Sequence, residues 1–324
     1  MSISHFRRPQ VALSGVVACI LVLLCSIGGA ASDLAQPELS DLVVQFQRVS
    51  SLHLSASVKI KASSALQDCC PQPDPDPKAD SDPIPGRFEY WATGDRYRIS
   101  SYVDSQRYPE MQTQVAFDGQ MFQLLRSDGT LSHSADDTSA LLPVLPNPLL
   151  ELLQFCYPLS DATAQFDIRL KDVQSDGAAQ RFDSVQWSMV REGDRSLERA
   201  ILPGATYEER AYLHYVYVAP GSRHMPLRID RVTDTGRITS TEFFDYERVQ
   251  GQGGPTFWPR RIVLRAYDSQ GREAGNISFS IDHIAVDAEI RDGAFSIDPH
   301  TAQRIWDDSR QGFVGPSDFG ASGK

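Results

Sequence analysis

Strict alternation of apolar and polar residues is the feature that most constrains the fold of this chain. In the segment LHLSASVKI, residues 52–60, every second residue from Leu52 to Ile60 is apolar, and the residues between them are polar. A period of two is typical of a β-strand with one buried and one solvated face. His53 and Lys59 are therefore expected on the solvated face.

The same alternation recurs along most of the 324 residues, with turn signals between the runs. GRFEYWATGDRYRIS, residues 86–100, predicts a hairpin, and two Asp-Gly pairs, at 118–119 and 128–129, predict type I′ turns. Further strands are expected at 164–173, 184–190 and 211–219, and further hairpins turn at 234–236 and 269–271. No β-α-β rhythm is present, so the predicted fold is mainly β (α+β) with an antiparallel sheet.

Three helices are predicted to accompany this sheet. Leu39, Leu42, Val43 and Phe46 form one apolar stripe of a helix near residues 39–49. Asn147 can cap a second, leucine-rich helix that starts at Pro148 and reaches residue 155. A short third helix is expected to start at Pro299, with Asp298 as its N-terminal cap.

The N-terminus indicates export. A basic stretch, an apolar run and small residues near Ala30 predict a signal peptide over residues 1–31. An uncleaved anchor and a lipoprotein signal around Cys19, in VVAC, are the alternatives. Export places the protein in the periplasm or cell envelope, where disulfides can form. At most one of Cys69 and Cys70 can then pair with Cys156, because adjacent cysteines cannot both reach it; a fold without disulfides is the other option.

The remainder is expected to form one domain, residues 32–308, followed by a disordered tail, residues 309–324. Residues 63–85 carry six prolines, which lock φ and remove backbone donors. This segment is interpreted as a loop insertion in which no strand pairing forms.

Composition and motifs exclude several functions. The formal net charge of −11 argues against nucleic-acid binding. No zinc, nucleophile-elbow or phosphate-loop motif is present, and GQGG at 251–254 lacks the context of a dinucleotide site. His283 follows Asp282, but adjacent residues on a strand point to opposite faces, so His283 is interpreted as structural. The protein is therefore predicted to be non-enzymatic, with no cofactor, metal site or catalytic residue.

The order of these features resembles the LolA/LolB-like superfamily of periplasmic lipoprotein carriers, as a long, divergent member. The resemblance extends over roughly Leu39 to Pro299, and after the leader it rests on LSDLVVQFQRVSSLHLSASVKI, GRFEYWATGDRYRIS, VAFDGQMFQLL, MPLRIDRVTDTGRITSTEFFDYERV and AFSIDP. It implies a strongly curved antiparallel sheet, or incomplete β-barrel, with covering helices as a lid. It also implies that acyl chains bind in the hollow.

On this reading, apolar side chains on the sheet and helices line a lipid-binding cavity. The candidates are Leu42, Phe46, Val58, Phe88, Tyr90, Tyr97, Ile99, Phe117, Phe122, Leu149, Leu153, Trp187, Tyr215 and Phe243. The expected ligand is a lipid or lipoprotein acyl chain, handled by a monomer with a possible envelope protein partner. The alternatives are a protein-interaction or sensor module with a filled core, and an envelope hydrolase whose residues converge only in the fold.

Overall fold

The structure is a computed structural model that describes residues 39–62, 83–104, 112–134, 145–153, 185–207, 210–222, 225–307 and 312–317. All of them belong to the compact unit Pro37–Lys324. The expected leader, the three cysteines after it, residues 63–82 and the predicted strand 164–173 lie outside the described residues. Within the described part of the chain, no helix is long and apolar enough to cross a membrane.

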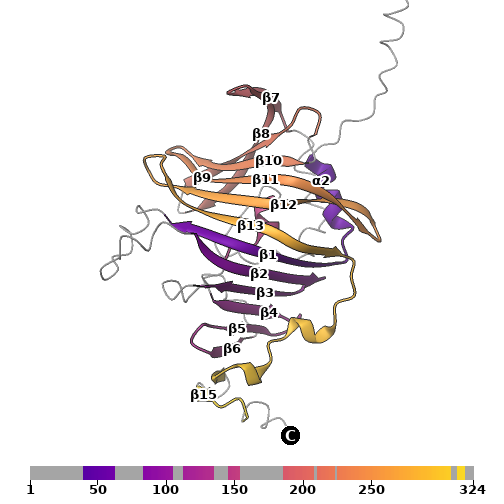
Figure 1. Cartoon of the computed structure of the whole chain (residues 1–324), viewed down its shortest axis with the longest axis vertical. Helices are drawn as coiled ribbons and strands as arrows, with labels where there is room; N and C mark the ends of the chain where they lie inside the picture. The colour runs from indigo at the N-terminus through magenta and orange to yellow at the C-terminus, as the bar shows by residue number, and fades with distance from the viewer. Residues whose placement is uncertain are drawn as a thin grey trace, which may run out of the picture. The chain divides into compact units, whose positions relative to one another are not determined.

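The described strands form one curved, open 15-stranded sheet (Figure 1). Its order is β15-β14-β6-β5-β4-β3-β2-β1-β13-β12-β11-β10-β9-β8-β7, and its two end strands do not pair with each other. The prediction of a mainly β fold with a curved antiparallel sheet and few helices is confirmed. The strands are β1 (Ser51–Ala62), β2 (Ile84–Thr93), β3 (Arg96–Val103), β4 (Thr113–Phe117), β5 (Phe122–Leu125), β6 (Thr130–Ser134), β7 (Trp187–Glu192), β8 (Arg195–Tyr207), β9 (Arg210–Val218), β10 (Pro226–Thr233), β11 (Gly236–Gly251), β12 (Gly254–Tyr267), β13 (Glu273–Val286), β14 (Arg304–Asp307) and β15 (Gly312–Val314).

Two meanders make up most of the sheet, and they meet at its centre. One runs outward from β1 to β6, and the other runs from the central β13 back to β7. They join where β1 and β13 pair antiparallel, from Leu52 opposite Val286 to Ala62 opposite Gly275. The β6–β14 pair is parallel, which departs from the expected antiparallel sheet.

One face of the sheet, here called the inner face, carries a single hydrophobic cluster that extends from β5 to β8. Its members alternate along each strand, as the period-two pattern requires: Leu54 and Val58 on β1 are almost fully buried, whereas Lys59 is exposed. The predicted strand at 52–60 is thus confirmed, with the expected side chains buried.

Two helices cover the inner face, α2 (Leu39–Gln47) and α4 (Pro148–Leu153). Phe46 of α2 packs edge-to-face on Trp258, with 4.7 Å between ring centroids. The predicted cap of α4 is confirmed, because Asn147 Oδ1 accepts a hydrogen bond of 3.0 Å from the Leu149 amide. α2 ends two residues earlier than predicted, and residues 154 and 155 of the second predicted helix lie outside the described residues.

The C-terminal arm confirms one prediction, the short helix at Pro299, and corrects another. It contains two 3-10 helices, η6 (Asp292–Phe295) and η7 (Pro299–Thr301), then β14 and β15. Asp298 caps η7 as expected, but the chain then turns into a strand instead of extending the helix. Part of the segment predicted as disordered tail forms β15. Ile297 and Ile305 pack on the outer face against Leu131, an attachment made by residues distant in sequence.

The turns at the Asp-Gly pairs form where predicted, but they are not type I′. Gly119 and Gly129 have φ of 100° and 74°, whereas neither Asp118 nor Asp128 adopts a positive φ. Each aspartate instead accepts backbone amides: Asp118 Oδ1 accepts from Gln120 at 2.8 Å. The sequence signal therefore works through side-chain capping of the turn and not through aspartate in the left-handed region.

Proline proves compatible with pairing at the end of the proline-rich segment. Pro85 lies in β2, opposite Lys59 of β1, and its carbonyl accepts a hydrogen bond of 2.9 Å from Asp104. The prediction that no pairing forms up to residue 85 is therefore wrong at this end. Proline lacks a donor but keeps its acceptor, so it is tolerated where a strand begins.

Asp287 fastens the end of the β1–β13 pair. Its φ is 56°, and its carboxylate accepts hydrogen bonds from the Ser50 amide at 2.7 Å and hydroxyl at 2.8 Å, and from the Gln252 amide at 2.6 Å. Burial raises the pKa of this carboxyl, but the hydrogen bonds from Ser50, Gln252 and Gly253 outweigh it and hold the pKa below its ordinary value. One side chain thus ties together the start of β1, the end of β13 and the β11–β12 turn.

We predict that Asp287→Gly lowers the free energy of unfolding by about 2 kcal/mol, because several charge-assisted hydrogen bonds are lost while glycine tolerates the positive φ. Asp245→Gly is the matched control: Asp245 has a φ of 58° but a side chain that is 70% exposed. Urea unfolding at pH 7 should show little change for the control. The fold lowers the pKa of Asp287, so this carboxylate stabilises the protein only while it is ionised. The cost of Asp287→Gly should therefore disappear as pH falls below about 4 and the carboxylate becomes protonated. Equal costs for the two variants would contradict this role.

Candidate functional site

The structure brings most of the predicted cavity residues together on the inner face. Those that are almost fully buried in the single cluster are Leu42, Phe46, Val58, Phe88, Tyr90, Tyr97, Ile99, Phe122, Leu149 and Phe243. Phe117 and Trp187 are partly buried and pack against the same cluster. Residues from seven strands and both helices therefore share one apolar surface.

Two predicted residues are not placed with this cluster. Tyr215 lies on the opposite face of β9 from Val216, which is fully buried in the cluster. Its ring packs under the Arg199 guanidinium at 5.1 Å, so its assignment to the cavity is wrong. The side chain of Leu153, at the end of α4, lies outside the described residues.

A polar group that the sequence analysis missed interrupts the apolar inner face. His214 on β9 is 1% exposed and lies opposite Arg231 on β10, while Thr241 on β11 lies opposite the buried Ile229. Thr241 Oγ1 donates a hydrogen bond of 2.9 Å to Glu151 Oε2 on α4. This bond ties the helix to the sheet at a point surrounded by apolar contacts.

The electrostatics of Glu151 oppose that attachment. Burial raises the pKa of the Glu151 carboxyl, and the Arg231 charge and the Thr241 hydrogen bond only partly offset the rise. The ionised form is thus disfavoured in this environment. The contact between α4 and the sheet therefore depends on protonation.

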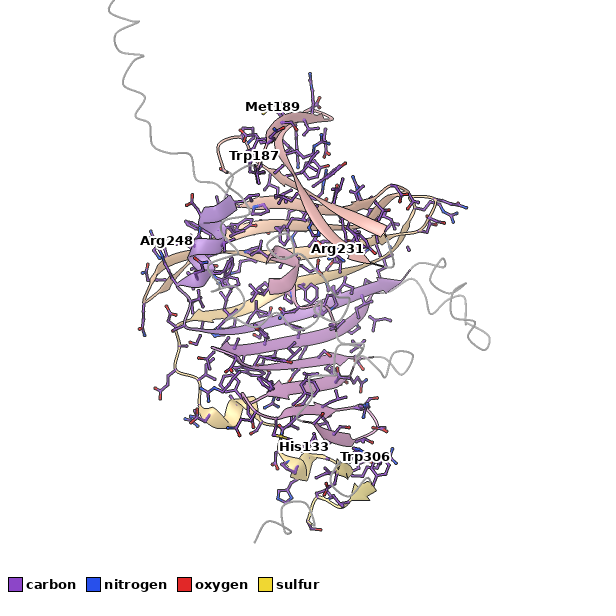
Figure 2. All side chains as sticks on the ribbon, turned by 180° about the vertical axis from the view of Figure 1, so that it is seen from behind. His133, Trp187, Met189, Arg231, Arg248 and Trp306 are labelled. Atoms are coloured by element: carbon purple, nitrogen blue, oxygen red, sulfur yellow. The ribbon has the colours of Figure 1, made fainter. Side chains whose placement is uncertain are left out.

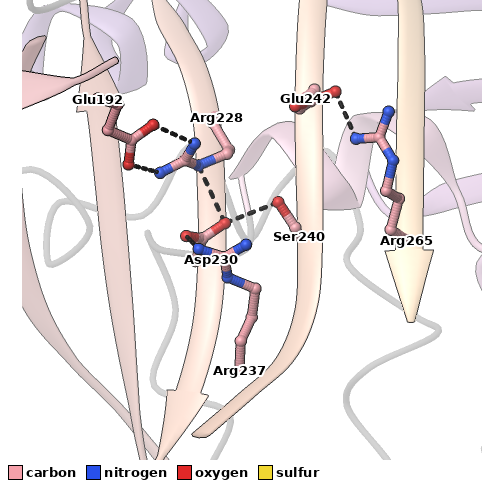
Figure 3. A network of polar contacts seen from close by, with 7 residues as sticks. All are labelled: Glu192, Arg228, Asp230, Arg237, Ser240, Glu242 and Arg265. Carbon is pink, nitrogen blue, oxygen red and sulfur yellow. Dashed lines mark hydrogen bonds and ion pairs between the residues drawn. The ribbon is translucent and has the colours of Figure 1, made fainter. Parts of the chain in front are cut away.

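The outer face of β7–β12 carries a network of ion pairs (Figure 3). Arg228 donates to both carboxylate oxygens of Glu192, at 2.7 and 2.5 Å, and its guanidinium stacks 3.8 Å from the centroid of the Tyr217 ring. Asp230, whose side chain is 1% exposed, lies between Arg228 Nε at 3.2 Å and Arg237 Nη2 at 3.0 Å. Ser240 donates to the same carboxylate at 2.7 Å.

This network is best explained as structural. Burial raises the pKa of Asp230, although Ser240 and the two arginines favour its charged form. The carboxylate is occupied by partners from its own and the adjacent strand, which leaves it poorly placed to act on a ligand. Among the described residues, no cluster of three or more His, Cys, Asp or Glu side chains can hold a metal ion.

A groove of about 670 Å³ lies on the outer face at the other half of the sheet. Its walls come from β13 and from β1 to β5, and they are mainly polar. The lining residues are Ser55, Ala56, Ser57, Arg87, Phe88, Glu89, Ser100, Ser101, Tyr102, Gln112, Thr113, Gln114, Leu125, Arg126, Ser127 and Asp282. The sequence analysis assigned this face to solvent and predicted no site on it.

His53, expected simply to face solvent, belongs to an ordered array beside this groove. Its Nε2 lies 2.9 Å from Glu89 Oε1, and its ring stacks on Trp91 with centroids 5.0 Å apart and planes 6° apart. His283 contacts the His53 ring edge-on, with 5.1 Å between the ring centroids. Side chains on this part of the outer face are therefore held by contacts with one another as well as facing solvent.

Comparison with known proteins finds no matching family model and no matching curated protein. Solved structures similar in fold include a DUF1329 family protein from Desulfovibrio piger, with a TM-score of 0.43 and 10% identity, covering 79% of this chain and 95% of that one. They also include a putative outer membrane lipoprotein-sorting protein domain from Vibrio parahaemolyticus, with a TM-score of 0.40 and 8% identity, covering 79% and 95%. The Pseudomonas aeruginosa MucA/MucB complex matches with a TM-score of 0.22 and 9% identity, covering 78% and 99%.

These likenesses concern the course of the chain alone.

We predict that Asp230→Ala lowers the free energy of unfolding by about 3–5 kcal/mol, because it leaves two guanidinium groups beside a vacated buried site. Glu247→Ala is the matched control, since Glu247 pairs with Arg260 at 2.5 Å but is 54% exposed. An exposed pair contributes little to stability, because water and salt screen it. Chemical denaturation of the three proteins measures the difference, and a cost for Asp230→Ala no larger than that of the control would contradict the structural role.

Proposed function

We propose that the protein binds an acyl chain of a lipid or lipoprotein at its inner face and carries it in the periplasm to an envelope partner, after export by its N-terminal leader. The observation that carries the proposal is the single apolar cluster that spans the inner face from β5 to β8 under α2 and α4. The resemblance of the sequence to periplasmic lipoprotein carriers agrees with this use of the face.

The cover of the inner face is suited to opening. α4 has six residues, from Pro148 to Leu153, and a helix this short is not stable alone in water. Its position therefore depends on contacts of Leu149 and Leu152 with the cluster, and on the Glu151–Thr241 hydrogen bond. An acyl chain can replace the apolar part of these contacts, because it offers the same kind of surface.

The energetics suit a carrier that must release its cargo. Burying one methylene stabilises a complex by about 0.8 kcal/mol, so a 16-carbon chain fully enclosed would gain on the order of 12 kcal/mol. Helix contacts surrendered to the chain reduce this gain. The exchange of one apolar partner for another keeps binding reversible.

We predict that the natively purified protein carries lipid, detectable by native mass spectrometry, and takes up a fluorescent 16-carbon fatty acid in a titration that palmitate reverses. Ala92→Leu should weaken uptake about tenfold, because the larger side chain on the inner face displaces roughly two methylenes of cargo. Ala92 is 0% exposed and belongs to the inner cluster.

Ala116→Leu is the matched control for Ala92→Leu. Ala116 is equally buried, but it packs in the outer cluster with Leu131 and Ile305. It should cost comparable stability and leave uptake unchanged. Repeated absence of lipid from the purified protein, together with no uptake of the fatty acid, would overturn the proposed function.

Glu151→Gln should hold α4 more firmly at neutral pH. Burial raises the pKa of Glu151 in the folded protein, so the stability of the wild type falls as pH rises above about 4.3, the pKa of glutamate in an unfolded chain. The variant, which has no charge to bury, should therefore melt at a higher temperature than the wild type at pH 7. The two melting temperatures should converge near pH 4. The variant should also take up the fatty acid more slowly in stopped-flow fluorescence; a lower melting temperature at pH 7 would contradict this account.

A further inference from the structure

The outer-face groove is separate from the inner-face site, since most of its walls are side chains that alternate with the buried ones. Ser55 and Ser57 on β1 flank Ala56, and Arg87 and Glu89 on β2 flank Phe88. The strands that form it, β13 and β1 to β5, each have a neighbour on both sides in the sheet. Their backbone groups are engaged in that pairing, so no strand can be added here and a ligand must be recognised by side chains.

The chemistry of the lining selects for an uncharged, hydroxyl-rich ligand. Short hydroxyl and amide side chains dominate the walls, among them Ser100, Gln112 and Gln114. The charged members balance, with Arg87 and Arg126 against Glu89 and Asp282. A membrane surface or nucleic acid would require a net positive site, which this groove does not offer.

The polar groups of the groove are held in place before any ligand arrives. Ser57 Oγ donates to Asp282 at 2.7 Å, and Gln112 Nε2 donates to the Val103 carbonyl at 2.7 Å. Gln114 Oε1 accepts a hydrogen bond of 2.7 Å from Arg98. Side chains fixed in this way lose little conformational freedom on binding, which favours affinity.

Tyr102 supplies an aromatic surface at the groove. It is 50% exposed, unlike most large apolar side chains of the fold. One face of a sugar ring consists of C–H groups and its rim of hydroxyls, so it can pack on such a ring while its hydroxyls bond to the groove walls. The volume of the groove, about 670 Å³, lies in the range of about 300–1,000 Å³ that is typical of small-ligand sites.

We propose that this groove, lined by the outer-face residues of β13 and β1–β5 and flanked by Tyr102, binds a neutral oligosaccharide. The site is independent of acyl binding at the inner face. The protein then has two faces of different chemistry, one for hydrocarbon and one for glycan.

A glycan microarray that carries neutral and acidic oligosaccharides tests the proposal with the full chain, and calorimetry on the strongest neutral hit measures its affinity. We expect binding of at least one neutral oligosaccharide, with an affinity that changes less than twofold between 50 and 500 mM NaCl. Tyr102→Ala should weaken it at least tenfold, and Ser100→Trp, which fills the groove, should abolish it.

Phe313→Ala is the control, because Phe313 on β15 is an aromatic residue with 54% exposure outside the groove. It should bind the glycan as the wild type does. Circular dichroism and fatty-acid uptake establish that each variant is folded. The proposal is overturned if no neutral glycan binds, if only acidic glycans bind in a salt-dependent manner, or if folded Tyr102→Ala and Ser100→Trp bind as well as the control.

Discussion

The pairing of β1 with β13 is the interaction on which the rest of the structure depends. Every other neighbour in the described sheet except β6–β14 is adjacent along the chain, so each meander is built from local hairpins. Only the β1–β13 ladder converts two local ribbons into one surface wide enough to bury an inner cluster. Its register also sets which side chains face inward across the join, since a shift by one residue would exchange the faces. The hydrogen bonds that Asp287 accepts from Ser50 and from the β11–β12 turn fix that register at one end.

Alternation along the strands gives the two faces independent chemistries. The inner face is apolar, and its exception, the group around Glu151 and Thr241, lies where a helix is attached. The outer face is divided: β7 to β12 carry closed ion-pair networks around Asp230, whereas β13 and β1 to β5 carry an open groove. Figure 2 draws the described side chains on the ribbon and labels Arg231, which lies on β10 in the upper part of the view. The buried ion-pair network thus occupies one half of the outer face, and the polar groove occupies the other half.

Local patterns made most of the sheet predictable. The alternation at 52–60, the hairpin at 86–100 and the turns at 234–236 and 269–271 are set by nearby residues, and the structure contains them. The parallel β14 was not predictable, because Ile305 is held by Leu131, far away in the sequence. The failure at Tyr215 has the same origin: an aromatic residue on a strand can serve either face, and only the register with its neighbours decides. Neither the Glu151 attachment nor the outer groove leaves a contiguous signal, since each is assembled from several strands. A carboxylate inside the leucine-rich run at 148–153 was the one available hint.

The C-terminal arm has a consequence for how the chain emerges from the ribosome. β6 ends at Ser134, but β14, which covers its free edge, begins only at Arg304. During synthesis, both edge strands of the β1–β6 ribbon therefore remain unpaired until β13 and β14 have been made. Leu131 on the outer face remains exposed to solvent for the same time. Unpaired edge strands can pair with strands of other chains, so a chain released before β13 and β14 are made is expected to be prone to aggregation. Pairing with β13 and β14 is what protects the two borders of this ribbon from self-association.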